Sequence, residues 1–252
     1  MAERFYSPTI GSDDSVVLTG DEAQHLARVR RIHRGARVQV FDGSGIEFDA
    51  VVREIGRGEV VLNIEAKKFV NRELPFSLTL GCSPAKGDRL RWLIEKATEL
   101  GVSRFVPILT ERSSEQARGL RSERTRRWVI EACKQCGRNV LMEVTDAVAW
   151  LDFLASNTSQ SIRLIAAPTG SLLHMLDETL VRGGIAIAVG PEGGFTCGEF
   201  DAALGKGWLP ISLGPRTLRV ETAALAMVAG VTAYVRPRVG AGGSKDNRLL
   251  GR

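Results

Sequence analysis

The sequence predicts an α/β protein in which a mainly parallel sheet, covered by helices on both faces, follows a small N-terminal β-barrel. From residue 76 to about 236, apolar β-rich runs alternate with helical runs, which is typical of parallel strands joined by crossover helices. Residues 1–70 instead hold three β-rich runs separated by the turn sequences DGSG and GRG, which favours a small antiparallel barrel. We therefore expect domains at 1–70 and 76–236, followed by a disordered basic tail at 237–252.

The N-terminal part is expected to contain a short helix at 20–31, followed by strands within the segment ARVQVFDGSGIEFDAVVREIGRGEVVLNIEA. The segment KKFVNRELP, residues 67–75, is expected to be a linker between the two parts.

In the larger part, we expect strands and helices to alternate along the chain. The expected strands are 76–83, 104–109, 162–168, 184–190 and 209–214, and the expected helices are 87–101, 121–137, 171–180, 196–207 and 220–235. The strands are nearly all apolar, as is usual for strands covered on both faces. Gly101 and Gly137 stand where helix-terminating glycines belong, and Thr196 with Glu199 forms a Thr-x-x-Glu capping box.

Composition excludes several classes of protein. The 252 residues are 44% hydrophobic and 25% charged, which is ordinary for a soluble globular protein. No run approaches the roughly 18 apolar residues of a membrane span, and the N-terminus lacks the apolar core of a secretory signal, so we expect a cytoplasmic protein. Cys133 and Cys136 form CKQC without a second ligand pair, so we interpret them as neighbours on a helix face and expect no metal.

Positive charge is concentrated in separate segments, although the formal net charge is only +5. Residues 26–38 hold five arginines and no acid, and residues 112–138 hold eight basic and three acidic side chains. One such cluster would be explained by a solvated helix face. Two separate clusters favour a polyanionic partner, and nucleic acid in particular.

Three expected strands end in loops of similar character, AAPTGS, VGPEGGFT and SLGPRTLRVET. Because ligands of parallel α/β sheets bind outside the carboxyl ends of strands, these loops could form one pocket. Gly190, Gly193 and Gly194 would let the backbone approach a ligand closely or adopt positive φ, although each glycine could also serve only to turn the chain.

Known catalytic motifs narrow the choice of ligand. The sequence GPEGGF does not fit the dinucleotide pattern G-x-G-x-x-G, and the chain has neither a phosphate-binding P-loop nor a G-x-S-x-G nucleophile elbow. His25, His33 and His174 lie far apart in the sequence, which opposes a histidine site. The pocket would be lined mainly by backbone, with Arg216, Arg219, Glu192 and Glu221 nearby. It suits an uncharged or cationic ligand, such as an adenosyl group, as well as a phosphate.

The order of several motifs makes the chain similar to a known family. EKATELGV, TERS, EACKQCGRN, GPEGGF and LGPRTLRVETA together resemble the RsmE family within the SPOUT superfamily, the 16S ribosomal RNA uridine-N3 methyltransferases. The resemblance covers about residues 1–236. It implies a PUA-like N-terminal barrel and a C-terminal sheet with a deep trefoil knot, a feature that is rare in proteins. It also implies a homodimer and methylation of one uridine in assembled small ribosomal subunits.

The resemblance further implies roles for particular residues. S-adenosylmethionine would be held by the three loops, and the expected cofactor-binding residues are Pro168, Val189, Gly190, Gly193, Gly194, Leu213, Leu218, Thr222 and Ala223. The expected RNA-binding residues are Arg28, Arg30, Arg31, Arg34, Arg112, Arg138 and Asn139, with Arg37 as a further phosphate contact. For Arg112, Arg138 and Asn139, helix-end capping and a solvated surface remain the alternative. The expected catalytic residues are Arg219, as a cation that stabilises deprotonated uracil, and Glu221, as a base.

Alternatives remain open at this point. Glu221 could instead be placed at the start of a helix because a carboxylate there is favourable to the helix dipole. The chain could also be a knotted 2′-O-ribose RNA methyltransferase, or a ribosome-assembly factor that binds RNA without catalysis. The intact LRVET sequence argues against the loss of catalysis.

Overall fold

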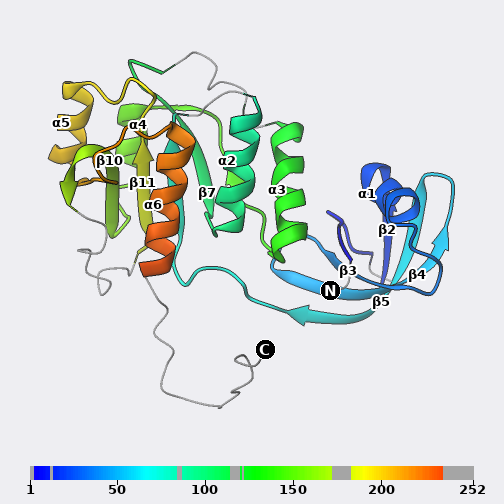
Figure 1. Ribbon diagram of the computed structural model, residues 1–252. Coiled ribbons are helices and arrows are strands. Elements are labelled where there is room, and N and C mark those ends of the chain that lie inside the picture. Colours follow the sequence, from blue (N-terminus) through cyan, green and yellow to red (C-terminus); the bar gives the residue numbers. More distant parts are fainter. Residues whose placement is uncertain are drawn as a thin grey trace, which may run out of the picture.

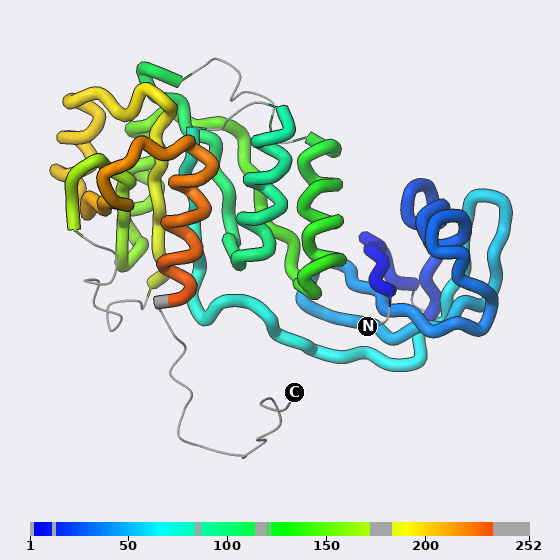
Figure 2. The backbone as a smooth tube through the Cα atoms, viewed as in Figure 1, coloured from blue at the N-terminus to red at the C-terminus, as the bar shows by residue number. Residues whose placement is uncertain are grey.

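Two sheets, one from each part of the chain, organise the molecule. The computed structural model describes residues 3–11, 14–83, 87–113, 120, 122–171 and 183–234. The expected helix at 171–180 and the basic tail at 237–252 lie outside the described residues, the first apart from Ser171. Figures 1 and 2 show an elongated molecule, with the smaller sheet at one end and the larger α/β part at the other.

The smaller sheet has the strand order β1-β3-β4-β5-β2. Its elements are β1 (Arg4–Tyr6), β2 (Ser15–Thr19), α1 (Gly20–Gln24), the π-helical turn η1 (His25–Val29), β3 (Arg37–Phe41), β4 (Ile46–Ile55) and β5 (Glu59–Phe69). All pairings are antiparallel except that of β1 with β3. Alternate residues such as Val16 and Leu18 are buried while Val17 is exposed, so one face of the sheet packs on a core that includes Leu26.

The expected linker begins later than the sequence suggested. Lys67 and Lys68 pair with Phe48 and Glu47 of β4, so β5 continues to Phe69 and only the following residues connect the two sheets. The pairing with β4 extends the strand through residues whose polarity had suggested a linker.

The larger sheet has the order β12-β10-β11-β6-β7-β8, with β9 also paired to β7, and every pairing is parallel. Its elements are β6 (Leu78–Cys82), α2 (Asp88–Glu99), β7 (Arg104–Leu109), α3 (Glu123–Cys136), β8 (Glu143–Val144), β9 (Val148–Ala149), α4 (Trp150–Ser156), β10 (Ile162–Ser171), β11 (Ile185–Val189), α5 (Cys197–Gly205), β12 (Leu209–Ile211) and α6 (Val220–Tyr234). The predicted α/β class and the small β part are therefore confirmed, whereas the knot stays a prediction.

Helices cover both faces of the larger sheet, as β11 illustrates. Ile185 and Ile187 point into the core under α2, α3 and α6, whereas Ala186 and Ala188 point into the second core. That second core contains the aromatic side chains of Trp150, Phe153, Phe195, Phe200 and Trp208. Space there is tight, because a Cβ on Gly81 would lie 2.2 Å from Phe153 Cζ. On this face β6 carries Gly81 where the Phe153 ring of α4 approaches closely, and β11 carries Ala186 and Ala188.

The structure differs from the sequence-based prediction in two segments. The sequence analysis assigned no helix to residues 150–156, where α4 supplies Trp150, Phe153 and Leu154 to the second core. The AAPTGS segment was expected to be a loop, but β10 runs through it to Ser171, with a shift of register against β12 between Ala166 and Ser171. An irregular strand thus replaces the loop, because its backbone still pairs with Ile211.

The helix ends follow the expected signals. Gly101 and Gly137 have φ of +88° and +84°, in the left-handed region that ends helices. The Thr196–Glu199 capping box is present with both of its hydrogen bonds. Among the described residues, no helix combines the length and apolar character needed to cross a membrane.

Candidate functional site

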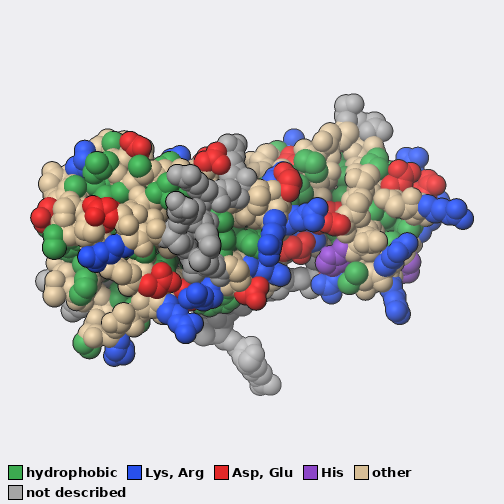
Figure 3. Space-filling view, turned by 90° about the horizontal axis from the view of Figure 1, so that it is seen from above, with side chains coloured by type: hydrophobic (Ala, Val, Ile, Leu, Met, Phe, Trp, Pro, Cys, Tyr) green, Lys and Arg blue, Asp and Glu red, His purple; other side chains and the backbone are tan. Residues whose placement is uncertain are grey.

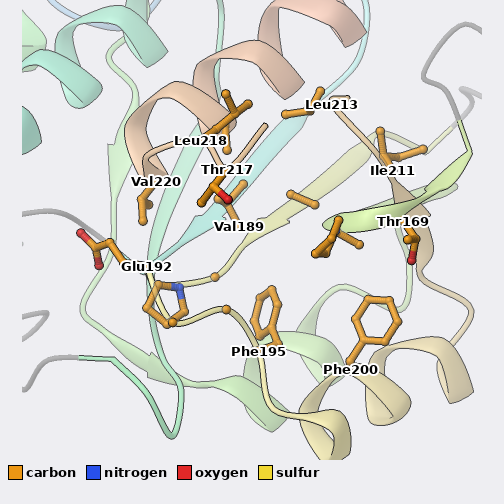
Figure 4. A pocket seen from close by; sticks show the side chains of 18 of the residues that line it. Thr169, Val189, Glu192, Phe195, Phe200, Ile211, Leu213, Thr217, Leu218 and Val220 are labelled. Atoms are coloured by element: carbon orange, nitrogen blue, oxygen red, sulfur yellow. The ribbon is translucent and has the colours of Figure 1, made fainter. Parts of the chain in front are cut away.

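A cavity of about 570 Å³ opens at the carboxyl ends of β10, β11 and β12. Its walls come from residues 166–169, 189–197, 211 and 213–218, together with Arg112 after β7 and the first turn of α6. Figure 4 shows Glu192 and Val220 at one end of the cavity and Phe200, Thr169 and Ile211 at the other. The three loops predicted to form one pocket therefore do so, and the volume is typical of small-molecule sites.

The glycine-rich loop after β11 brings backbone to the cavity wall. A Cβ on Gly190 would lie 3.0 Å from the ring of Phe195, and Gly194 has a φ of +69°. The Gly194 N–H donates to the Pro191 carbonyl at 2.8 Å and closes a tight turn. Arg112 Nη1 donates to the Gly193 carbonyl at 2.6 Å. Side chains are thus absent where this loop must approach Phe195 and turn sharply.

Glu199 ties this loop to the end of β7. Its Oε1 accepts from the Glu111 N–H at 2.8 Å, and its Oε2 accepts from the Thr196 N–H at 2.9 Å. Trp150 Nε1 donates to the Glu199 carbonyl at 2.9 Å. Because Glu199 is buried and bonded on both oxygens, the start of α5 is a fixed wall of the cavity.

The third loop is fixed by Ser212. Its Oγ donates to the Pro168 carbonyl at 3.1 Å and accepts from the Gly214 N–H at 3.3 Å. Gly214 has a φ of +99°, which favours glycine at this turn. These contacts join the second half of β10 to the loop after β12, at the point where the chain turns towards α6.

The predicted cofactor-binding residues other than Thr222 line the cavity. They are Pro168, Val189, Gly190, Gly193, Gly194, Leu213, Leu218 and Ala223. Thr222 is exposed on α6 and is not part of the lining. Sequence reasoning missed Phe195 and Phe200, and placed Arg112 only on the RNA side. Phe195 directly follows the glycine loop, which was the available signal for an aromatic wall.

The two predicted catalytic residues lie outside the cavity lining. Arg219 is exposed, between the lining residues Leu218 and Val220. Glu221 is only 5% exposed, and its Oε2 is buried without a hydrogen-bond partner. Its Oε1 lies 3.9 Å from Arg89 Nη1. Arg219 is therefore accessible from solvent beside the cavity lining, whereas the carboxylate of Glu221 is buried.

The site also influences a neighbouring thiol. Cys82, at the end of β6, is fully buried, and burial raises the pKa of its thiol, with smaller contributions from the negative charges of Glu221 and Glu192. The thiol is therefore held in its protonated form. Among the described residues, no group of His, Cys, Asp and Glu side chains could hold a metal ion.

The expectation that Arg138 and Asn139 lie on an RNA-binding surface is wrong. Arg138 is 3% exposed and donates to the Thr98 and Val102 carbonyls at 2.8 and 3.0 Å, and to both oxygens of Glu73. Asn139 is equally buried, and its Nδ2 donates to the Val70 carbonyl at 3.1 Å. Their donors are used to join the connecting segment to the larger part.

The five arginines of residues 26–38 are exposed, as expected for phosphate contacts. They are Arg28, Arg30, Arg31, Arg34 and Arg37. Arg30 pairs with Glu3 and Arg37 with Glu65. Figure 3 shows basic side chains gathered with histidines over this end of the molecule. The surface has the charge that RNA phosphates require.

Comparisons with known proteins support the same family as the motifs. The model of an RNA methyltransferase domain matches residues 72–232, and that of an RNA methyltransferase PUA domain matches residues 18–65. The chain is 33% identical to ribosomal RNA small subunit methyltransferase E of Synechocystis over 88% of this chain and 74% of the relative. It is also 33% identical to the protein of that name from Aquifex aeolicus, over 85% of this chain and 92% of the relative.

Two solved structures resemble the whole chain. Ribosomal RNA small subunit methyltransferase E from Neisseria gonorrhoeae, bound to S-adenosylmethionine, aligns with a TM-score of 0.84 and 31% identity over 92% of this chain and 98% of that one. A protein of Legionella pneumophila in complex with the same cofactor aligns with a TM-score of 0.85, 30% identity and the same coverage.

Proposed function

This chain belongs to the ribosomal RNA small subunit methyltransferase E family of S-adenosylmethionine-dependent RNA methyltransferases, and we propose that its target is N3 of one uridine in 16S ribosomal RNA. The observation that supports S-adenosylmethionine as the cofactor is the cavity at the carboxyl ends of β10, β11 and β12. Its walls combine backbone, the aromatic rings of Phe195 and Phe200, and the carboxylate of Glu192. Such a wall fits an apolar adenosine with a positively charged sulfonium.

We propose that the residues that line the cavity hold the cofactor, which supplies an electrophilic methyl group when bound. The glycine loop would present backbone groups to it, since a side chain at Gly190 would collide with Phe195. Leu213, Leu218 and Ala223 would cover its apolar part. Alignment of the methyl group with the attacking nitrogen is the main contribution expected of these residues. We retain Thr222 as a proposed contact to the cofactor, although it lies outside the cavity lining and could be reached only from outside the cavity.

We propose that Arg219 is the catalytic cation. N3 lies on the Watson–Crick edge of uracil, so the base must be unpaired or flipped out to reach the cavity. The nitrogen must also lose its proton, and a guanidinium beside the base stabilises the resulting anion. Arg219 is exposed between two lining residues, which supports this role. Glu221 is buried beside Arg89, which favours an indirect role over that of a base.

We propose that residues 1–70 form the RNA-binding domain and residues 76–236 the methyltransferase domain. The exposed arginines 28, 30, 31 and 34 would contact phosphates and place the RNA without reading its sequence. Arg112, at the cavity wall, would contact either the RNA or the cofactor. Replacement of each arginine that contacts a phosphate should make the negative slope of log affinity against log salt less steep by about one.

We also propose that the protein acts as a homodimer in the cytoplasm, with each cavity near the interface between subunits. The resemblance in sequence supports the dimer, and a ribosomal substrate supports the location. Light scattering coupled to size-exclusion chromatography tests the first point. A monomeric mass of about 27.4 kDa at assay concentration would contradict it.

Analysis of the methylated nucleoside tests the proposed reaction. Small ribosomal subunits from a strain that lacks the corresponding modification are incubated with the protein and isotopically labelled S-adenosylmethionine. Digestion and mass spectrometry should yield labelled 3-methyluridine. A ribose-methylated nucleoside would refute N3 chemistry and support the 2′-O reaction. Binding of subunits without any labelled product, together with no calorimetric signal for the cofactor, would support a non-catalytic assembly factor.

A further inference from the structure

Arg89 lies between two carboxylates that belong to different walls of the site. Its Nη1 is 3.9 Å from Glu221 Oε1, on the first turn of α6, and 4.0 Å from Glu192 Oε1, in the glycine loop. Arg89 itself is the second residue of α2. One guanidinium therefore connects a buried helix start, a second helix and the loop that covers the cavity.

The carboxylate of Glu221 requires such a partner. Its side chain is 7% exposed, and Oε2 accepts no hydrogen bond. The start of α6 offers it a favourable helix dipole, but a buried charge without a cation is costly. Arg89 is the cation found within 4.0 Å of it in the described part of the chain. Glu221 thus fixes Arg89 in place as much as Arg89 compensates Glu221.

The glycine loop is held on a second side by another arginine. Arg112 Nη1 donates to the Gly193 carbonyl at 2.6 Å from the end of β7, while Arg89 approaches Glu192 from α2. Glu192 and Gly193 are the two central residues of the turn that the Gly194 N–H and the Pro191 carbonyl close. The position of this turn therefore depends on two arginines, which reach it from α2 and from the end of β7.

We propose that Arg89 is a positioning residue, anchored on Glu221, that holds Glu192 and the glycine loop in the conformation that binds the cofactor. The inference rests on the proposed S-adenosylmethionine site. It assigns Glu221 the function of an anchor for Arg89, and it places neither residue in contact with the reacting atoms. Arg89 should thus affect the affinity for the cofactor more than the rate of methyl transfer.

Calorimetric titration of S-adenosylmethionine into the full chain, without RNA, tests the proposal. Arg89→Ala should raise the dissociation constant by about 3- to 10-fold, the range expected for loss of a partly exposed ion pair that orders a loop. At saturating cofactor, kcat should change by less than about 2-fold. Arg89→Lys should recover part of the affinity, because it retains the charge without the planar guanidinium.

Arg91 provides the matched control on the same helix. It is similarly exposed, but it donates to Glu95 of α2 at 2.7 Å and so stays within its own helix. Arg91→Ala should leave the dissociation constant for the cofactor unchanged. Equal effects of Arg89→Ala and Arg91→Ala would contradict the proposal, because a general perturbation of α2, and not the loss of the Arg89 contacts, would then weaken cofactor binding.

Double substitutions separate the loss of the Arg89 contacts from a general loss of stability. Because Glu192 is exposed, Glu192→Gln should keep the fold, and it should weaken cofactor binding as Arg89→Ala does. The two changes together should cost less than the sum of the single effects, because they remove the same contact. Glu221→Gln should restore thermal stability to Arg89→Ala, since no unpaired buried charge remains.

The outcomes distinguish this proposal from the proposed function. Failure of the unchanged protein to bind S-adenosylmethionine would refute the cofactor site itself. Normal cofactor binding by the unchanged protein, together with an unchanged cofactor affinity in Arg89→Ala, would overturn only the proposed role of Arg89. Strictly additive effects of Arg89→Ala and Glu192→Gln would overturn it too. If Arg89→Ala fails to fold, an unchanged affinity in Glu192→Gln decides against the proposal.

Discussion

Arg4 and Glu47 form a short ion pair across the smaller sheet, with 2.6 Å between Arg4 Nη1 and Glu47 Oε2. The other amino group of Arg4 donates to the Arg138 carbonyl at 3.2 Å and to Asn139 Oδ1 at 2.7 Å. Arg72 shares Oε2 of Glu47 at 2.9 Å and also reaches the Gly137 carbonyl. A single buried carboxylate therefore organises two arginines that join the smaller part to the end of α3.

Glu47→Gln should lower the free energy of unfolding by about 2 kcal/mol or more at pH 7, because it leaves two cations without their shared, buried anion. Burial alone would raise the pKa of the Glu47 carboxyl, but hydrogen bonds from Arg72 and Arg4 outweigh it and lower the pKa. The stabilisation is thus complete above the ordinary value of 4.5 and is lost as the pH falls through the lower folded value. Urea unfolding at several pH values measures both effects.

The control for this prediction is Glu65→Gln, which breaks an exposed pair with Arg37 and should change stability by less than about 1 kcal/mol. A difference between Glu47→Gln and the unchanged protein that stays constant down to pH 3 would contradict the assignment of the carboxylate.

Gly190→Ala should weaken binding of S-adenosylmethionine by about 10-fold or more, a cost of about 1.4 kcal/mol. The added Cβ would meet the Phe195 ring at 3.0 Å, so either the ring or the loop must move into the cavity. Gly198→Ala is the matched control, since a Cβ there meets nothing within 4 Å and alanine favours the α5 helix. Equal cofactor affinities in both variants, measured by calorimetry, would show that close approach at Gly190 is unimportant.

The layers of the fold could be predicted from the sequence because hydrophobic periodicity and helix-end signals are local. The run from Ile185 to Val189 is apolar throughout, and Gly137 ends its helix in the predicted way. The assignment of Arg138 was wrong because an arginine near a basic cluster looks the same whether it contacts RNA or Glu73. Only the packing of distant segments decides between the two.

The site was predicted in part for the same reason. Glycine loops at strand ends identified the cavity, because the carboxyl ends of parallel strands meet at one edge. Arg89 carried no signal of its own, since it stands at the start of an ordinary amphipathic helix far from Glu192 and Glu221 in the sequence. Contacts between elements that the topology brings together cannot be read from spacing within either element.

Arg219→Ala should reduce kcat for methylation by about 100-fold while it leaves the affinity for S-adenosylmethionine unchanged. The guanidinium is expected to stabilise the deprotonated uracil, and Arg219 is absent from the cavity lining. Single-turnover methylation of small subunits, with calorimetry of the cofactor, separates the two quantities. Lys206→Ala, an exposed change at the end of α5, serves as the control for loss of a surface cation. Near-normal turnover in Arg219→Ala would reject the catalytic role.

Cys197 reports whether the cofactor occupies the proposed cavity. It is exposed at the first position of α5 and lines the cavity, whereas Cys136 is half-buried on α3. Cys133 is buried, and this burial raises the pKa of its thiol to about 12, so it should stay unreactive in the folded protein. S-Adenosylmethionine should therefore slow the alkylation of Cys197 by iodoacetamide and leave the rate at Cys136 unchanged, as followed by peptide mass spectrometry. Equal protection of both cysteines would indicate general stiffening, and an unchanged rate at Cys197 under saturating cofactor would place the ligand elsewhere.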